Sequence, residues 1–155
     1  MKTKTTLFAL LVSAATLTLS FAADDAFMGT WKFNQAKSKI PAGAGHNNTV
    51  VYAQSGDELK VTVDGVDGAG KALHSDWTGK LDGKEYPVKG VASHDMRAYT
   101  KVDAHTLTYT FKKGGKSVGH GKVVLAADGK SRTVTETMTG PDGKAVDTTQ
   151  VFDKQ

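Results

Sequence analysis

The chain has 155 residues, a formal net charge of +4 at pH 7 and no cysteine. This charge is mild and the basic residues form no Lys/Arg block, which argues against a nucleic-acid partner. The lack of cysteine excludes disulfides and thiol chemistry, so a hydrophobic core must stabilise the fold. The length suits one domain of ordinary size.

Residues 1–22 have the pattern of an export signal. Lys2 and Lys4 give a positive start, Leu7–Leu19 is mostly apolar, and Ser20–Ala22 has the small residues of a cleavage site. The apolar segment is shorter than the roughly 20 residues that span a bilayer, so a short membrane anchor is the less favoured alternative. The sequence predicts a signal peptide over residues 1–22 and a domain over residues 23–155 with no membrane span, in the periplasm or secreted.

Residues Ala23–Phe27 are expected to be a short, poorly ordered lead-in to the first strand, Gly29–Asn34. Trp31 and Phe33 alternate with polar residues in this strand, so their rings share one face. One or two helical turns are expected over Gln35–Ile40, with the last residue of the strand as N-cap. A loop then leads to the second strand.

Nine further strands are expected, separated by turns rich in Gly and Asp. They lie at residues 48–54, 59–63, 71–80, 84–89, 95–102, 105–112, 116–127, 131–139 and 145–152. The last three hairpins turn at Gly-Gly or Asp-Gly pairs, which accept the positive φ of tight turns. Pro87 cannot donate a hydrogen bond to a β-ladder, so its strand should be short, bulged or at an edge.

Sequential strands joined by short turns predict an all-β, antiparallel fold. Closing such a sheet into an up-and-down barrel removes both exposed edges. A two-sheet sandwich is the alternative, although it needs longer crossing connections than this chain offers. The expected fold class is therefore an antiparallel up-and-down β-barrel of about ten strands, which holds either packed side chains or one small ligand.

Both ends of the domain and several internal segments resemble a known family. These segments are Gly29–Asn34 with Ala36–Ser38, Val61–Asp67, Asp82–Val88, Phe111–Lys116 and Thr148–Gln155. Through them the chain resembles small exported bacterial lipocalin-like proteins, a group of calycin-type β-barrels with no assigned activity. The resemblance implies a barrel of the lipocalin and fatty-acid-binding-protein type.

Two features depart from the calycin pattern. Calycin barrels usually place an Arg of the last strand against the Trp of the first, whereas the last strand here holds Thr149 and Gln150 but no Arg. That cation–π contact is therefore expected to be missing or rebuilt. Fatty-acid-binding proteins insert two helices between the first two strands, and Asn34–Asn47 is too short for such a pair.

The histidines are scattered and lack the spacing of metal ligands. They are His46, His74, His94, His105 and His120. Structural or surface roles are expected for them, except that Gly119 and Gly121 leave space around His120. No nucleophile motif, paired-carboxylate context or phosphate-binding loop stands out, so the sequence predicts no enzyme activity, no cofactor and no metal site.

Several aromatic residues lie mid-strand, where they belong either to a packed core or to the wall of a ligand cavity. Trp77, Tyr99 and Tyr109, chosen for their central positions and polar tips, and His120, chosen for its glycine neighbours, are the predicted ligand-binding residues. The sequence thus predicts an exported protein that binds a small apolar or amphipathic molecule without catalysis. The alternative is a filled barrel, an interaction or structural protein of the cell envelope that acts through its surface.

Overall fold

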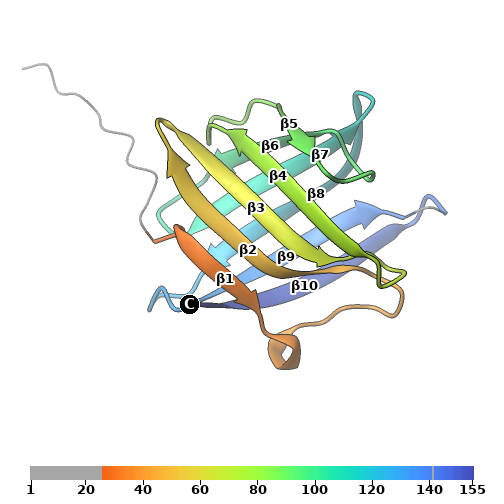
Figure 1. The fold of residues 1–155 in the computed structure, drawn as a ribbon, viewed down its shortest axis with the longest axis horizontal. Coiled ribbons are helices and arrows are strands. Elements are labelled where there is room, and N and C mark those ends of the chain that lie inside the picture. Colours follow the sequence, from red (N-terminus) through yellow and green to blue (C-terminus); the bar gives the residue numbers. More distant parts are fainter. Residues whose placement is uncertain (1–25, 141) are drawn as a thin grey trace, which may run out of the picture.

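The computed structural model describes residues 26–140 and 142–155 (Figure 1). Its strands are β1 (Gly29–Phe33), β2 (His46–Ser55), β3 (Glu58–Val66), β4 (Ala72–Gly79), β5 (Tyr86–Lys89), β6 (Met96–Lys101), β7 (Thr106–Lys113), β8 (Lys116–Leu125), β9 (Ser131–Thr139) and β10 (Ala145–Lys154). Each strand pairs antiparallel with the next, and β10 pairs with β1, so the described residues form a closed barrel. The predicted up-and-down barrel is confirmed, and the β1–β10 pairing rules out the sandwich. The predicted signal peptide, residues 1–22, lies outside the described residues.

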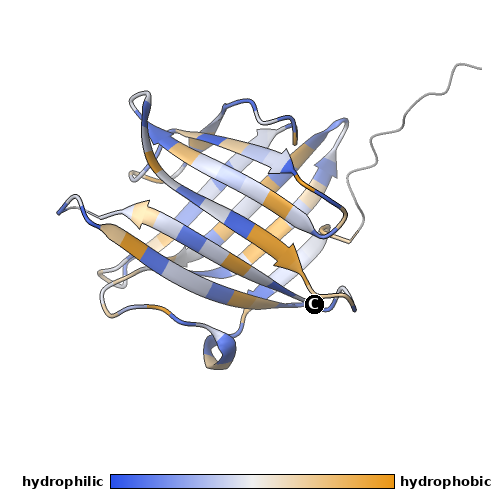
Figure 2. Ribbon diagram, turned by 180° about the vertical axis from the view of Figure 1, so that it is seen from behind, coloured by the Kyte–Doolittle hydropathy of each residue, from blue (hydrophilic) through white to orange (hydrophobic). Residues whose placement is uncertain are grey.

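Alternate residues of the strands face the interior. In β3, Leu59, Val61 and Val63 are buried and the residues between them are more exposed. Figure 2 shows hydrophobic and hydrophilic residues alternating along the strands. The buried hydrophobic side chains form one cluster inside the barrel, so the period-two pattern of the sequence is its inside–outside pattern.

Aromatic packing around Trp31 closes one end of the barrel. The side chain of Trp31 is fully buried, and its indole Nε1 donates a hydrogen bond of 2.9 Å to the carbonyl oxygen of Phe27. The expectation of a poorly ordered lead-in was wrong for Phe27, because its ring is 2% exposed and belongs to the same buried cluster as Trp31.

The cation–π contact with Trp31 is rebuilt with an arginine from β9. The guanidinium carbon of Arg132 lies 4.8 Å from the ring centroid of Trp31, 4.5 Å from that of Tyr52 and 5.1 Å from that of Phe152. Arg132 pairs in register with Phe152 of β10, so an arginine one strand earlier reaches the same place. Lys154 of the last strand adds an ammonium group 5.2 Å from the Trp31 ring.

The remaining local features follow the sequence closely. A single 3-10 turn, η1 (Gln35–Lys37), follows β1, and the Asn34 side chain accepts a hydrogen bond from the Lys37 backbone N–H. β5, which contains Pro87, is short and forms two residue pairs with each neighbour. Within residues 26–140 and 142–155, no helix is long and apolar enough to cross a membrane.

Candidate ligand cavity

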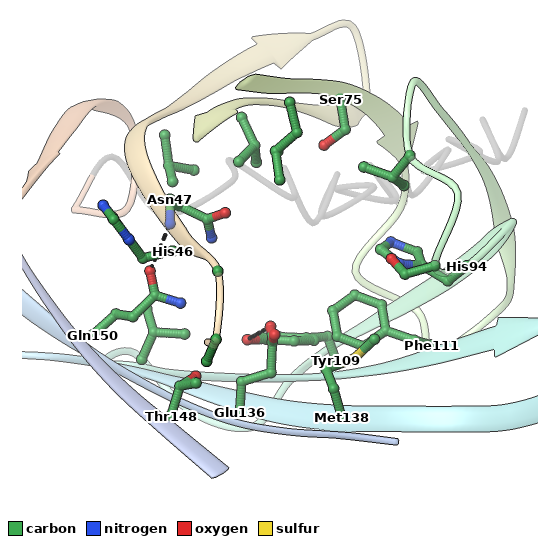
Figure 3. A pocket seen from close by; sticks show the side chains of 18 of the residues that line it. His46, Asn47, Ser75, His94, Tyr109, Phe111, Glu136, Met138, Thr148 and Gln150 are labelled. Carbon is green, nitrogen blue, oxygen red and sulfur yellow. Dashed lines mark hydrogen bonds between the residues drawn. The ribbon is translucent and has the colours of Figure 1, made fainter. Parts of the chain in front are cut away.

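The barrel encloses a cavity of about 330 Å³ (Figure 3). Its mouth lies among three connections, at residues 43–45, 67–68 and 91–94, and it extends down to Arg132 and Phe152 at the closed end. Side chains from β2, β3, β4 and β6 to β10 line it. The interior is therefore not filled by side chains, in contrast to what the alternative from the sequence requires.

Most of the cavity wall is apolar. The apolar side chains include Val50, Val61, Val63, Leu73, Phe111, Val123, Val134 and Met138. A wall of this kind removes the hydrocarbon part of a ligand from water, which favours binding. Polar groups occur at only a few positions among these side chains, where they would fix the orientation of a bound molecule.

Arg132 is a buried cation without a polar partner among the described residues. It is 2% exposed, and in this part of the chain its Nε and Nη1 atoms have no hydrogen-bond acceptor and no carboxylate pairs with it. Three aromatic rings surround it, as described above, and they supply cation–π attraction but accept no ordinary hydrogen bond. A buried charge is costly unless it is paired, so Arg132 lacks an anion or another acceptor at the cavity floor.

Arg97 of β6 lies higher in the cavity and has neutral partners. Its Nη2 lies 3.1 Å from Nε2 of His94, and its Nη1 lies 3.5 Å from the Tyr99 hydroxyl. Because a guanidinium only donates, His94 accepts at Nε2 and carries its proton on Nδ1, 3.0 Å from the Ser93 hydroxyl. Burial, reinforced by the charge of Arg97, lowers the pKa of His94 to about 3. His94 is thus a neutral part of the wall.

Glu136 of β9 places a carboxyl group in the same cavity. The Tyr109 hydroxyl donates a hydrogen bond of 3.0 Å to Oε2 of Glu136, and Figure 3 shows both side chains on one wall. Gly121 lies between them in register, and a Cβ atom there would collide with the Tyr109 ring. Burial raises the pKa of the Glu136 carboxyl, while the bond from Tyr109 and the charge of Arg97 oppose that rise.

Gln150 secures the strand at the cavity mouth. This side chain is 3% exposed, and its Oε1 accepts a hydrogen bond of 2.9 Å from the backbone N–H of Asn47. The β2–β3 register shifts between Asn47 and Thr49, so Gln150 satisfies a backbone donor next to a bulge. The bulge and its partner shape the rim through which a ligand would enter.

The predicted ligand-binding residues divide between the inside and the outside of the barrel. Tyr99 and Tyr109 line the cavity, whereas Trp77 is packed in the core and donates from Nε1 to the Arg97 carbonyl oxygen at 3.1 Å. The expectation that His120 lines the cavity was wrong: its side chain is exposed on the outer face. Gly119 and Gly121 beside it face inward, so strand alternation turns His120 outward. Contact of these residues with a ligand stays a prediction.

The predictions from the sequence missed three charged residues of the cavity interior, Arg97, Arg132 and Glu136. A signal for two of them was present in β9, where threonines alternate with Arg132, Val134, Glu136 and Met138. Thr133, Thr135 and Thr137 face outward, which suits their β propensity and polarity, and the other set lines the cavity. Deciding first which alternate residues of β9 face the interior would have identified Arg132 and Glu136 as cavity residues.

Comparison with known proteins supports the fold. No protein-family model matches the sequence, and no curated protein does. The solved structure described as EF1p2_mFAP2b bound to DFHBI is similar with a TM-score of 0.50 and 12% identity, over 84% of this chain and 95% of that chain. A redesigned beta barrel, mFAP1, bound to DFHBI, gives a TM-score of 0.45 and 15% identity, over 85% of this chain and 98% of that chain.

The protein thus belongs to the class of closed, ten-stranded antiparallel β-barrels with an internal cavity. The likeness to the first of these structures agrees with that class, and at 12% identity it bears on the fold alone.

Proposed function

We propose that this protein is an exported, non-catalytic carrier that binds a small, partly apolar organic acid inside the barrel. The proposal rests on Arg132, a buried cation on the floor of a mostly apolar cavity. Its Nε and Nη1 donors lack acceptors among the described residues. The carboxylate of an amphipathic acid would supply the acceptors, and its hydrocarbon part would contact the apolar wall.

The size of the cavity and the fold support this proposal. About 330 Å³ is at the lower end of the range typical of small-molecule sites. The structure described as EF1p2_mFAP2b is bound to DFHBI, so a barrel of similar fold accommodates a small molecule. A surface-acting envelope protein with a filled barrel would have no use for such a cavity.

The state of His94, one of the two histidines that line the cavity, favours binding over catalysis. His94 accepts a hydrogen bond from Arg97 and has a pKa near 3, so it is a poor general base at neutral pH. Export rests on the pattern of residues 1–22, and a periplasmic or secreted location follows from it.

The binding proposal is tested by titrating the purified protein with dodecanoate and with dodecanol. Dodecanoate should bind saturably and more tightly than dodecanol, because only its carboxylate carries a negative charge to pair with the guanidinium of Arg132. Arg132→Gln should weaken dodecanoate binding about tenfold or more, as expected for loss of a charge-assisted hydrogen bond. Lys122→Gln, which removes a cation from the outer face of β8, is the matched control and should have no effect.

A wild-type protein that binds none of a panel of fatty acids, retinoids, haem and quinones would reject the carrier proposal. Near-ultraviolet circular dichroism of Arg132→Gln shows whether the closed end, where the guanidinium contacts three aromatic rings, is still folded.

A further inference from the structure

Two polar groups that the proposed acid does not use face the cavity above Arg132. Glu136 and Thr148 are direct cross-strand partners on β9 and β10, and both line the cavity. The Thr148 hydroxyl oxygen is buried and has no hydrogen-bond partner within residues 26–140 and 142–155. Figure 3 shows the two side chains on the same wall of the cavity.

The hydrogen-bonding capacity of these groups is complementary. A carboxylate accepts several hydrogen bonds, and the described part of the chain supplies Glu136 with one side-chain donor, the Tyr109 hydroxyl. The Thr148 hydroxyl has both a proton to donate and lone pairs to accept with. A ligand hydroxyl would satisfy both side chains at once, since it can donate to Glu136 and accept from Thr148.

The charges of the cavity favour a hydroxyl over an amine. Among the described residues that line the cavity, two cations, Arg97 and Arg132, face a single interior carboxylate, Glu136, and Asp67 at the mouth is exposed. With Glu136 ionised, the excess positive charge is balanced by one carboxylate of a ligand. An ammonium group on the ligand would restore the excess, and it has no lone pair to accept from Thr148.

Strand geometry sets the distance between the carboxylate of a ligand at Arg132 and a hydroxyl of the same ligand at Glu136. Arg132, Val134 and Glu136 are successive inward-facing residues of β9. At about 3.3 Å per residue, Arg132 and Glu136 are separated by about 13 Å along the strand. The apolar side chain of Val134 lies between them.

We propose that Glu136 and Thr148 form a hydroxyl-recognising subsite, and that the ligand is an elongated hydroxy acid with its carboxylate at Arg132. This inference rests on the proposed function, because it assumes that an acid occupies the cavity. The raised pKa of Glu136, caused by burial, agrees with a carboxyl group that lacks donors when no ligand is bound.

The test is a calorimetric titration with a series of saturated fatty acids, from octanoate to hexadecanoate, and with the ω-hydroxy form of each. Wild-type protein should prefer the hydroxy acid about tenfold at one chain length, because both ends of the ligand are held on β9. Thr148→Val and Glu136→Met should abolish that preference while the unsubstituted acid still binds. Thr149→Val, the outward-facing neighbour on β10, is the matched control and should retain it.

The outcomes separate this inference from the proposed function. Unsubstituted acids that bind without a hydroxyl preference at any length would overturn the subsite and leave the carrier intact. A preference that survives in both Thr148→Val and Glu136→Met would also overturn it. Failure of every acid to bind would remove both. If Glu136→Met does not fold, Thr148→Val decides, since it preserves the shape of the side chain.

Discussion

Arg132 has two roles that oppose each other energetically. It packs against Trp31, Tyr52 and Phe152 and so contributes to the closed end, while its buried and unsatisfied donors cost stability in the ligand-free protein. A bound anion would offset that cost. Ligand binding and stability should therefore be coupled through this residue.

Trp31 should be among the largest single contributors to stability. It is fully buried, bonded to the Phe27 carbonyl and in contact with Arg132. Trp31→Ala should cost about 3–5 kcal/mol, as other large-to-small core changes do, measured as a shift in the denaturant midpoint at constant slope. Val102→Ala is the control, because Val102 is 58% exposed. A Trp31→Ala midpoint close to that of wild type would contradict the packing of this end.

Glu136 should make stability depend on pH. Burial raises its pKa, so the folded state takes up a proton more readily than the unfolded state does. Proton uptake by folded Glu136 therefore adds to the free energy of unfolding. This stabilisation is fully present below the usual pKa of a glutamate and is lost as the pH rises through the raised pKa. Glu136→Gln removes this dependence but keeps an acceptor for Tyr109, so the variant should gain stability relative to wild type as the pH rises. Denaturation curves that keep a constant offset between pH 4 and pH 8 would contradict this.

Among the elements, β5 is the weakest part of the barrel wall. It has four residues, includes Pro87 and forms two residue pairs with each neighbour, whereas β9 pairs with both neighbours along most of its length. Few hydrogen bonds and little packing mean a low free energy of local opening. Backbone amides of β5 should exchange with deuterium faster than those of β9, measured by mass spectrometry after proteolysis. Equal protection of the two strands would contradict this.

The order of the strands could be predicted from the sequence, whereas the inward-facing residues could be predicted for some strands, such as β3, but not for β8. Gly-Gly and Asp-Gly pairs mark the last three hairpins, since tight turns need positive φ, and the structure has this conformation at Gly114, Gly129 and Gly143. The sequence of β8 indicates only weakly which of its residues face the interior, because Gly119 and Gly121 are small enough for either face. His120 was therefore assigned to the wrong side, and Glu136 and Arg132 were missed because charged residues are rarely expected inside a barrel.

For the whole molecule, the proposed export predicts a defined N-terminus. The positive start, the apolar segment Leu7–Leu19 and the small residues before Ala23 predict cleavage after Ala22. N-terminal sequencing of the protein from the extracytoplasmic fraction should begin at Ala23. Protein in that fraction that still begins at Met1 would contradict the prediction.

The central claim, that the barrel interior holds a partly apolar acid, is tested most directly by locating the ligand. Nuclear Overhauser contacts between isotope-labelled dodecanoate and protein methyl groups report which residues lie beside the chain. Val123 and Val134 line the cavity, while Val124, the next residue on β8, does not. The account predicts contacts to Val123 and Val134 and none to Val124. Contacts to Val124 without contacts to Val123 and Val134 would place the ligand on the outer surface and contradict the account.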